Sequence, residues 1–148
     1  MTVDQILAPF DVLVGLRAAT KSALLEDLAG RAAVALGIGG DAVFPALARR
    51  ENLGSTGIGG GIALPHARLE TVSRPYGILA RLREPVDFEA VDDNPVDLVF
   101  LLLLPAPSRH EPLNALACVA RRLRDAETAA AMRGARDAAG LYAAVTGG

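Results

Sequence analysis

The feature that most constrains the fold of this chain is a run of apolar residues bounded by prolines. No polar side chain interrupts Leu98–Leu104, and the segment lies between Pro95 and Pro105. A short apolar run enclosed by turn-forming residues is typical of a central strand that is buried on both faces of a sheet. Such a strand needs a covering layer on each side, so the run predicts a layered protein with the sheet in the middle.

Segments with helical periodicity lie on both sides of this strand in the sequence. Apolar residues recur at three-to-four spacing in 21–36 and in 113–124, which predicts two amphipathic helices. Weaker helical patterns and strand patterns occupy other segments: helices at 41–50, 126–132 and 137–145; strands at 12–16, 62–64, 76–82 and 84–91. This mixture predicts an α/β fold with a mixed sheet. Because the chain has no internal repeat or linker, we expect residues 1–148 to form a single domain.

Capping residues indicate where two of the helices begin and end. Thr20 is expected to be the N-cap of the first helix, and Gly37 to end it. Gly39 and Gly40 then predict a turn, after which Asp41 is expected to cap the second helix.

Composition limits the classes of function. The chain is 51% hydrophobic and 22% charged, as in a globular protein. A formal net charge of −2 gives no electrostatic reason to expect nucleic acid or an anionic membrane as a partner. The N-terminal residues lack the pattern of a secretory signal, and the longest apolar run is too short for membrane insertion. A single cysteine, Cys118, fits a reducing compartment, so we expect a cytoplasmic protein.

Residues Gly54–Arg68 contain the strongest candidates for chemistry. The segment holds five glycines, the hydroxyls of Ser55 and Thr56, and the pair Pro65-His66. Such a backbone turns tightly or approaches a ligand closely, so an ordinary glycine-rich loop and an anion-binding nest explain it equally well. The spacing of the glycines matches neither the dinucleotide-binding fingerprint nor the P-loop.

His66 is the candidate nucleophile of this segment. Pro65 restricts its own backbone and that of Leu64, so the histidine follows a defined path, and the glycines before it leave little bulk to cover it. A neutral imidazole is a competent nucleophile toward phosphorus. The alternative is a histidine without a chemical role, and the local sequence somewhat favours the functional interpretation.

Other chemistries and other charged residues have simpler explanations. With two histidines and one cysteine, none at metal-binding spacing, we expect neither a metal nor an organic cofactor. A Gly-x-Ser-x-Gly hydrolase motif is also missing. The aspartates Asp92, Asp93 and Asp97 are better explained by a turn, and the basic run Arg121, Arg122 and Arg124 by the C-terminal dipole of the 113–124 helix.

Three blocks of the sequence together resemble a known family. Residues 50–59 read Arg-Glu-Asn-Leu-Gly-Ser-Thr-Gly-Ile-Gly, and residues 61–66 read Gly-Ile-Ala-Leu-Pro-His. Both are similar to the enzyme IIA domain of the fructose/mannitol type, from the bacterial phosphoenolpyruvate-dependent phosphotransferase system. Residues 92–105 resemble a second block of that domain and 113–125 a third, and the resemblance spans about 6–145. With no sugar-transport domain attached, the chain is most similar to the nitrogen-regulatory branch.

This resemblance implies a phosphoryl carrier. His66 would become a tele-phosphohistidine by accepting a phosphoryl group from an HPr-like carrier protein, and Arg50 would lie near the phosphate. Transfer between two imidazoles needs in-line positioning and stabilisation of the phosphoryl oxygens, for which Ser55, Thr56 and the amide of Gly57 are candidate donors. The resemblance also implies an α/β fold with a mixed, mostly parallel sheet of about five strands flanked by helices on both faces.

The same resemblance implies regulatory partners. In the nitrogen-regulatory branch the phosphorylation state reports nitrogen and carbon status to potassium transport components or sensor kinases. Two alternatives remain: a module that binds proteins without carrying phosphate, and an enzyme IIA that serves a sugar permease.

Two positions depart from the family pattern. The second histidine of the family precedes a Leu-x-x-Leu-Ala sequence, where this chain has Pro112. His110 lies two residues earlier, and either it serves as a helper in the same pocket or that role is lost. Gly60 stands where many relatives have asparagine, which removes one hydrogen bond from the loop.

Overall fold

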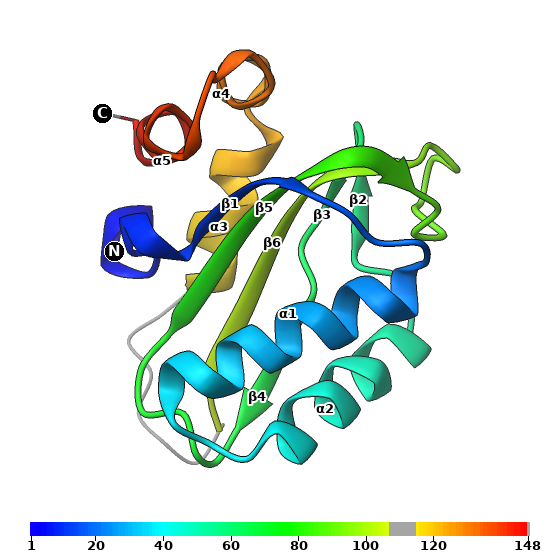
Figure 1. Cartoon of the computed structure of the whole chain (residues 1–148), viewed down its shortest axis with the longest axis vertical. Helices are drawn as coiled ribbons and strands as arrows, with labels where there is room; N and C mark the ends of the chain where they lie inside the picture. Colours follow the sequence, from blue (N-terminus) through cyan, green and yellow to red (C-terminus); the bar gives the residue numbers. More distant parts are fainter. Residues whose placement is uncertain (107–114, 148) are drawn as a thin grey trace.

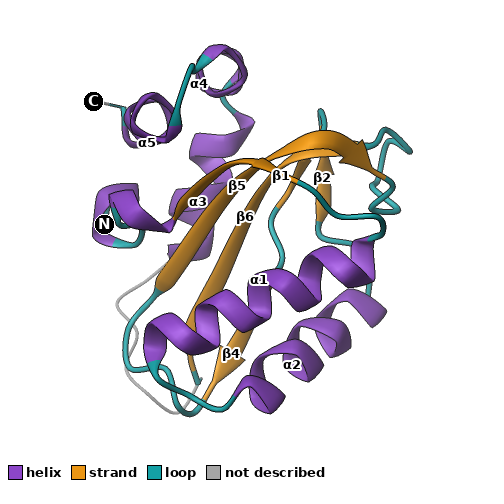
Figure 2. Ribbon diagram, viewed as in Figure 1, coloured by secondary structure: helices purple, strands orange, loops and turns teal. Residues whose placement is uncertain are grey.

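A six-stranded sheet lies between two groups of helices in the computed structural model, which describes residues 1–106 and 115–147. The strands are β1 (Val12–Leu16), β2 (Gly57–Gly59), β3 (Ile62–Ala63), β4 (His66–Leu69), β5 (Tyr76–Val86) and β6 (Val96–Pro105). The helices are α1 (Lys21–Leu36), α2 (Gly40–Asn52), α3 (Ala115–Arg124), α4 (Ala126–Gly134) and α5 (Ala138–Thr146), with short 3-10 turns η1 (Val3–Gln5) and η2 (Pro9–Asp11). Helices α1 and α2 cover one face of the sheet, and α3 lies behind it (Figures 1 and 2).

The sheet is mixed, as predicted, and β6 is its central strand. The strand order is β1-β5-β6-β3-β2, and β4 also pairs with β6. β5 is antiparallel to β6, whereas β3 and β4 both run parallel to it. β3 pairs with the first half of β6 and β4 with the second, because Leu64 and Pro65 interrupt what would otherwise be one strand. Six strands therefore occupy five positions across the sheet.

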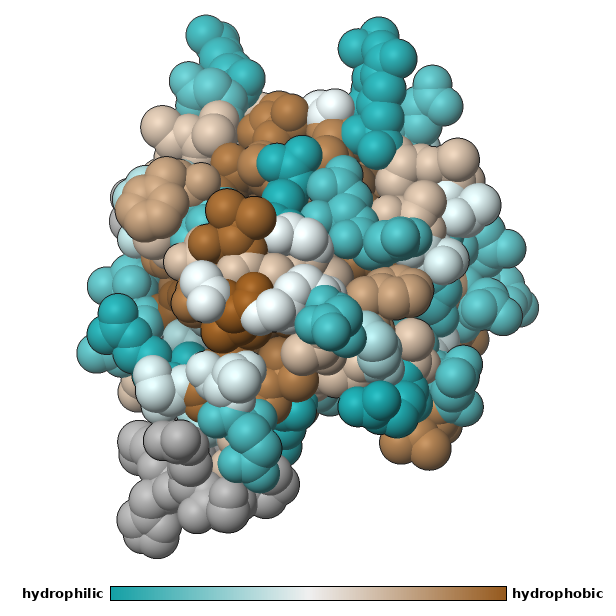
Figure 3. Space-filling view, turned by 60° about the horizontal axis from the view of Figure 1, so that its bottom comes forward, coloured by the Kyte–Doolittle hydropathy of each residue, from teal (hydrophilic) through white to brown (hydrophobic). Residues whose placement is uncertain are grey.

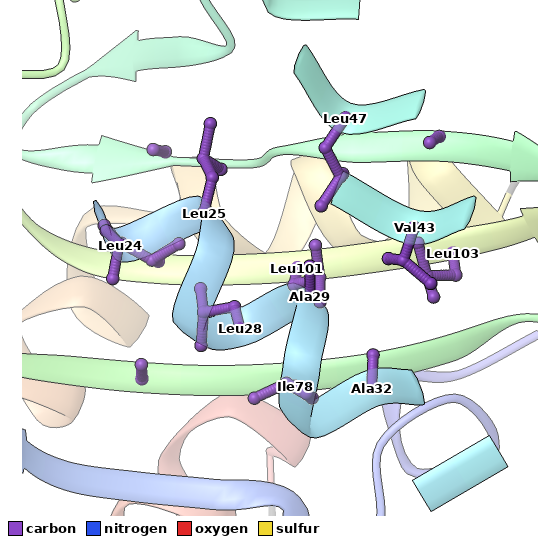
Figure 4. Packing of buried hydrophobic residues seen from close by; sticks show 14 of the residues in the cluster. Leu24, Leu25, Leu28, Ala29, Ala32, Val43, Leu47, Ile78, Leu101 and Leu103 are labelled. Carbon is purple, nitrogen blue, oxygen red and sulfur yellow. The ribbon is translucent and has the colours of Figure 1, made fainter. Parts of the chain in front are cut away.

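The core consists of two apolar layers separated by the sheet. Val99, Leu101 and Leu103 of β6 belong to the cluster with α1 and α2. The alternate residues belong to the cluster on the opposite face, with α3, α4 and α5: Leu98, Phe100, Leu102 and Leu104. Figure 4 shows the first layer, in which Leu25, Leu28 and Leu47 lie over the sheet near Leu101. Every residue of the apolar run is at most 1% exposed, so the predicted burial on both faces is confirmed.

The caps of α1 follow the prediction, but the start of α2 does not. The Thr20 hydroxyl accepts a hydrogen bond from the amide of Ala23, and Gly37 ends α1 in a left-handed conformation. Asp41 was expected to be the N-cap of α2, and that prediction is wrong, because the N-cap is Gly39. The chain turns at the left-handed Gly37, and the Gly39 carbonyl accepts a hydrogen bond from the amide of Ala42. Asp41 therefore lies inside the first turn, where its charge is favourable to the helix dipole.

The 84–91 segment, predicted as an edge strand or a bent ribbon, does not form a strand of its own. β5 continues through the predicted 76–82 strand as far as Val86, with an irregular register between Arg81 and Val86. Residues 87–90 then leave the sheet. Phe88 is nevertheless fully buried, because its ring packs against α1, where the Lys21 ammonium lies 4.6 Å from the ring centre.

The surface of the described residues carries scattered apolar side chains. On the face shown in Figure 3, hydrophobic residues gather near the centre and hydrophilic side chains project around the edge. The large exposed side chains include Phe10, Val34, Leu53 and Val91. Within residues 1–106 and 115–147, no helix has both the length and the apolar character needed to cross a membrane.

Candidate functional site

A cavity of about 460 Å³ lies beside β4 at the margin of the sheet. Its walls come from the C-terminal end of α2, the loop that follows, the start of β4, and α3. Since α2 and α3 cover opposite faces of the sheet, the cavity lies where the two layers approach each other around the sheet margin. Ligand sites of proteins commonly have this size and mixture of apolar and polar walls.

Four of the predicted site residues line this cavity together: Arg50, Ser55, Thr56 and His66. Gly57 does not line it. This residue is buried, and a Cβ atom there would lie 2.7 Å from the Cβ of Ala90, so the glycine allows two segments to pack closely. His110 and Pro112 lie outside the described residues.

The imidazole of His66 is held in one tautomer. Its Nδ1 lies 2.9 Å from the carbonyl oxygen of Leu64, which can only accept, so Nδ1 carries the proton. Nε2 accepts a hydrogen bond from Nε of Arg50 at 3.3 Å. The proline before the histidine keeps this path of the chain rigid. The result is a neutral imidazole whose unprotonated, nucleophilic nitrogen is Nε2.

Arg50 is itself anchored in the last turn of α2. Its Nη1 donates to the carbonyl of Gly54 at 2.8 Å, while Nε points at His66. This double contact fixes the plane of the guanidinium beside Nε2 of His66. An anion bound at Nε2 would therefore meet a cation that is already oriented.

The environment favours the neutral form of His66. Burial lowers the pKa of His66 below its ordinary value of 6.5; the Leu64 carbonyl raises it, and the positive charge of Arg50 lowers it again. The imidazole should therefore remain neutral, and competent as a nucleophile, at pH values where an exposed histidine is half protonated.

We expect an NMR titration of the His66 ring to give a midpoint below pH 6.5. Between the folded and unfolded pKa values the unfolded chain binds more protons, so this histidine makes stability rise with pH across that window. Its contribution is complete above 6.5 and is lost as the pH falls toward the folded pKa. A midpoint at or above 6.5 would contradict the buried geometry.

The hydroxyls of Ser55 and Thr56 are already engaged by the protein. Ser55 Oγ donates to the carbonyl of Phe88 at 2.8 Å and accepts from the amide of Gly57 at 3.1 Å. Thr56 Oγ1 donates to Oε2 of Glu51, and the Thr56 amide donates to Oε1 of the same carboxylate at 3.0 Å. Both side chains thus hold the loop in place, and an anion must displace these acceptors to receive their protons.

Glu51 was not singled out from the sequence, yet its contacts hold Thr56, which lines the cavity, in place. Its carboxylate, only 6% exposed, binds the amide and hydroxyl of Thr56 and lies 2.9 Å from Nζ of Lys21. Lys21 begins α1 and is 15% exposed. The ion pair therefore ties α1, α2 and the glycine-rich loop together. The sequence carries no signal for it, because Lys21 lies far from the loop along the chain.

Two further arginines line the cavity, and the sequence did not place them there: Arg68 and Arg124. Arg68 donates to the carbonyl of Pro105 at 3.2 Å. Together with Arg50 they give the lining three cations, and its described residues include no carboxylate. Within residues 1–106 and 115–147, no three His, Cys, Asp or Glu side chains come together as a metal site. The arrangement is suited to an anion beside a nucleophilic nitrogen.

Comparison with known proteins decides the family. Residues 5–147 match the family model described as the phosphoenolpyruvate-dependent sugar phosphotransferase system, EIIA 2. The chain belongs to the EIIA 2 family. The resemblance stated from the three sequence blocks is thereby confirmed.

Two relatives show which members of the family this chain is similar to. The EIIA 2 chain is 43% identical over 142 residues to a nitrogen regulatory protein from Bradyrhizobium diazoefficiens, covering 96% of this chain and 93% of that one. It is 41% identical over 128 residues to a nitrogen regulatory protein from Escherichia coli strain K12, covering 86% and 78%.

Solved structures agree with the fold. The nitrogen regulatory protein IIA-Ntr from Neisseria meningitidis is 30% identical, with a TM-score of 0.84, over 97% of this chain and 99% of that one. The IIA mannitol protein from Escherichia coli is 20% identical, with a TM-score of 0.75 over 93% of this chain and 97% of that one, which supports the shared fold alone. The chain is therefore an EIIA-type domain similar to the nitrogen-regulatory members.

Proposed function

We propose that this domain is a phosphohistidine carrier in which Nε2 of His66 accepts the phosphoryl group of an HPr-like carrier protein. The observation that carries the proposal is the hydrogen bond from Nδ1 of His66 to the Leu64 carbonyl. That bond leaves Nε2 without a proton, in a cationic cavity and beside an anchored arginine. The acceptor would be the tele nitrogen.

The chemical step needs no proton transfer to or from His66. The lone pair of Nε2 attacks phosphorus as the phosphorus–nitrogen bond of the donor phosphohistidine breaks, and the electron pair of that bond returns to the donor nitrogen. The proton stays on Nδ1 throughout, where it is donated to the Leu64 carbonyl. As the new bond forms, Nε of Arg50 loses its acceptor at Nε2 and becomes available to a phosphoryl oxygen.

We propose that the phosphorylation of this carrier serves regulation. The relatives that match most of the chain carry the name nitrogen regulatory protein, so we propose that the phosphorylation state signals nitrogen and carbon status. Potassium transport components and sensor kinases are the proposed kinds of target. The cytoplasm is the proposed location, because phosphoenolpyruvate and its phosphocarriers are there.

A role in sugar uptake is the second candidate, and one relative favours it. A fructose-specific EIIA component from Haloferax volcanii is 42% identical over 83 residues, which is 56% of this chain. The nitrogen regulatory relatives match over 86% or more at similar identity, so the regulatory readout is preferred.

The test is reconstitution with phosphoenolpyruvate, enzyme I and an HPr-like carrier. We expect one acid-labile phosphoryl group on the domain, and none when the carrier is omitted. Phosphorus–nitrogen couplings in the NMR spectrum should assign it to Nε2 of a histidine. Phosphate on Nδ1, or the failure of several loaded HPr-like carriers to transfer to the folded protein, would refute the proposal.

A further inference from the structure

Arg124 lines the cavity from α3, whereas the anchored Arg50 lines it from α2. One side of α3 packs into the core through Ala115, Val119 and Leu123, which are at most 1% exposed. The residues one position further on, 116, 120 and 124, follow at helical spacing and line the cavity instead. The register of α3 on the sheet thus places Arg124 on the same cavity as His66.

The guanidinium of Arg124 differs from those of Arg50 and Arg122, which are engaged by the protein. Arg50 donates to Gly54 and His66, and Arg122 donates to the carbonyl of Val145 at 3.0 Å. Arg124 makes no hydrogen bond or ion pair with any residue in 1–106 or 115–147. The adjacent carboxylate of Asp125 is used at the start of α4, where it accepts from the amide and hydroxyl of Thr128.

The described residues that line the cavity carry positive charge, which favours a bound anion. Arg50, Arg68 and Arg124 come from three different walls, and no carboxylate lines the cavity among the described residues. The nearby carboxylate of Glu51 already binds Lys21 and Thr56. Cations around a small cavity raise the local concentration of anions and stabilise bound negative charge.

We propose that Arg124 binds oxygens of the phosphoryl group during its transfer to Nε2 of His66; this assignment rests on the proposed carrier function. In that transfer negative charge is spread over three phosphoryl oxygens, so a single guanidinium cannot serve all of them. A second planar guanidinium, provided by α3, supplies the missing donors. No bond to Arg124 forms or breaks, so the balance of the step is unchanged.

Arg124 also borders a larger hollow of about 830 Å³, which lies between α3, the N-terminal residues and the end of α5. Arg121 lines that hollow but not the cavity of His66. Both side chains are exposed and carry the same charge on the same helix. Arg121→Ala is therefore the matched control for Arg124→Ala.

The experiment measures single-turnover transfer from a phosphorylated HPr-like carrier to each variant. We expect Arg124→Ala to slow the transfer about a hundredfold, the lower end of what the loss of one preorganised donor costs. Arg124→Lys should recover part of the rate, and Arg121→Ala should change it less than about twofold. Equal rates for Arg124→Ala and Arg121→Ala would overturn the assignment.

A second measurement separates this inference from the proposed function. Inorganic phosphate is titrated into the unphosphorylated protein while the ring resonances of His66 are followed by NMR. If the wild type accepts no phosphoryl group, the proposed function has failed and this titration alone decides on Arg124. Weaker phosphate binding by Arg124→Ala than by the wild type and Arg121→Ala then supports the site, whereas equal or absent binding overturns it.

Discussion

Replacing His66 by glutamine is expected to reduce phosphoryl acceptance to the background level. The glutamine amide can still accept a hydrogen bond from Arg50, but it has no nucleophilic nitrogen. Radiolabelled phosphoenolpyruvate with enzyme I and an HPr-like carrier gives the measurement directly, as acid-labile label on the protein. Because the substitution removes the acceptor itself, the loss should exceed that of any other single change in the cavity.

Two comparisons make this result specific. His66 is half-buried, so thermal unfolding should show that His66→Gln and His66→Ala remain folded. The other histidine provides a matched control: His110→Ala should still be labelled, but more slowly if that residue assists the transfer. Wild-type labelling of both His66 variants would place the acceptor elsewhere.

Replacing Glu51 by alanine is expected to cost about 3–5 kcal/mol of folding free energy, the usual result of breaking a buried ion pair from one side. The change leaves Lys21, which is 15% exposed, without its close carboxylate partner. It also removes both acceptors of Thr56 in the wall of the cavity. Denaturant unfolding monitored by circular dichroism measures the loss.

An exposed ion pair on α1 is the control for Glu51. Asp27 and Arg31 lie 2.8 Å apart at i,i+4 spacing with side chains 35% and 46% exposed, so Asp27→Ala should cost about 0.5 kcal/mol or less. In the double variant Lys21→Met/Glu51→Gln, no buried charge is left without a partner, and part of the stability should return. If Glu51→Ala costs no more than Asp27→Ala, the buried network does not stabilise the loop.

Local chemistry made much of the fold predictable. The apolar run of β6, the Thr20 cap and the Gly37 terminus each depend on a few neighbouring residues, and all three are confirmed. Two predictions were wrong, the start of α2 and the separate strand at 84–91, the first because of an adjacent residue and the second because of pairing with another strand. At Asp41 an adjacent glycine already began the helix, and at Val86 the pairing with β6 prolonged β5.

The candidate site was predictable only in part. Arg50, Ser55, Thr56 and His66 belong to one continuous stretch of about seventeen residues, and they line one cavity. The ion pair of Glu51 with Lys21, and the presence of Arg68 and Arg124 at the cavity, were not anticipated. The ion pair and the position of Arg124 join segments that are distant in the sequence, and no local pattern encodes them. Arg68 is different, because it lies two residues after His66 in β4, at the spacing that places both side chains on one side of a strand.

The sequence by itself determined the central strand and the family, and it supplied His66 as the candidate nucleophile, because each depends on residues that lie close together along the chain. Only the tertiary structure decided which nitrogen of His66 is unprotonated, since that depends on the Leu64 carbonyl and on Arg50. It also decided that the hydroxyls of Ser55 and Thr56 are engaged, while the guanidinium of Arg124 has no partner within residues 1–106 and 115–147. Whether a polar group can bind a ligand depends on which partners the packing of distant segments brings to it.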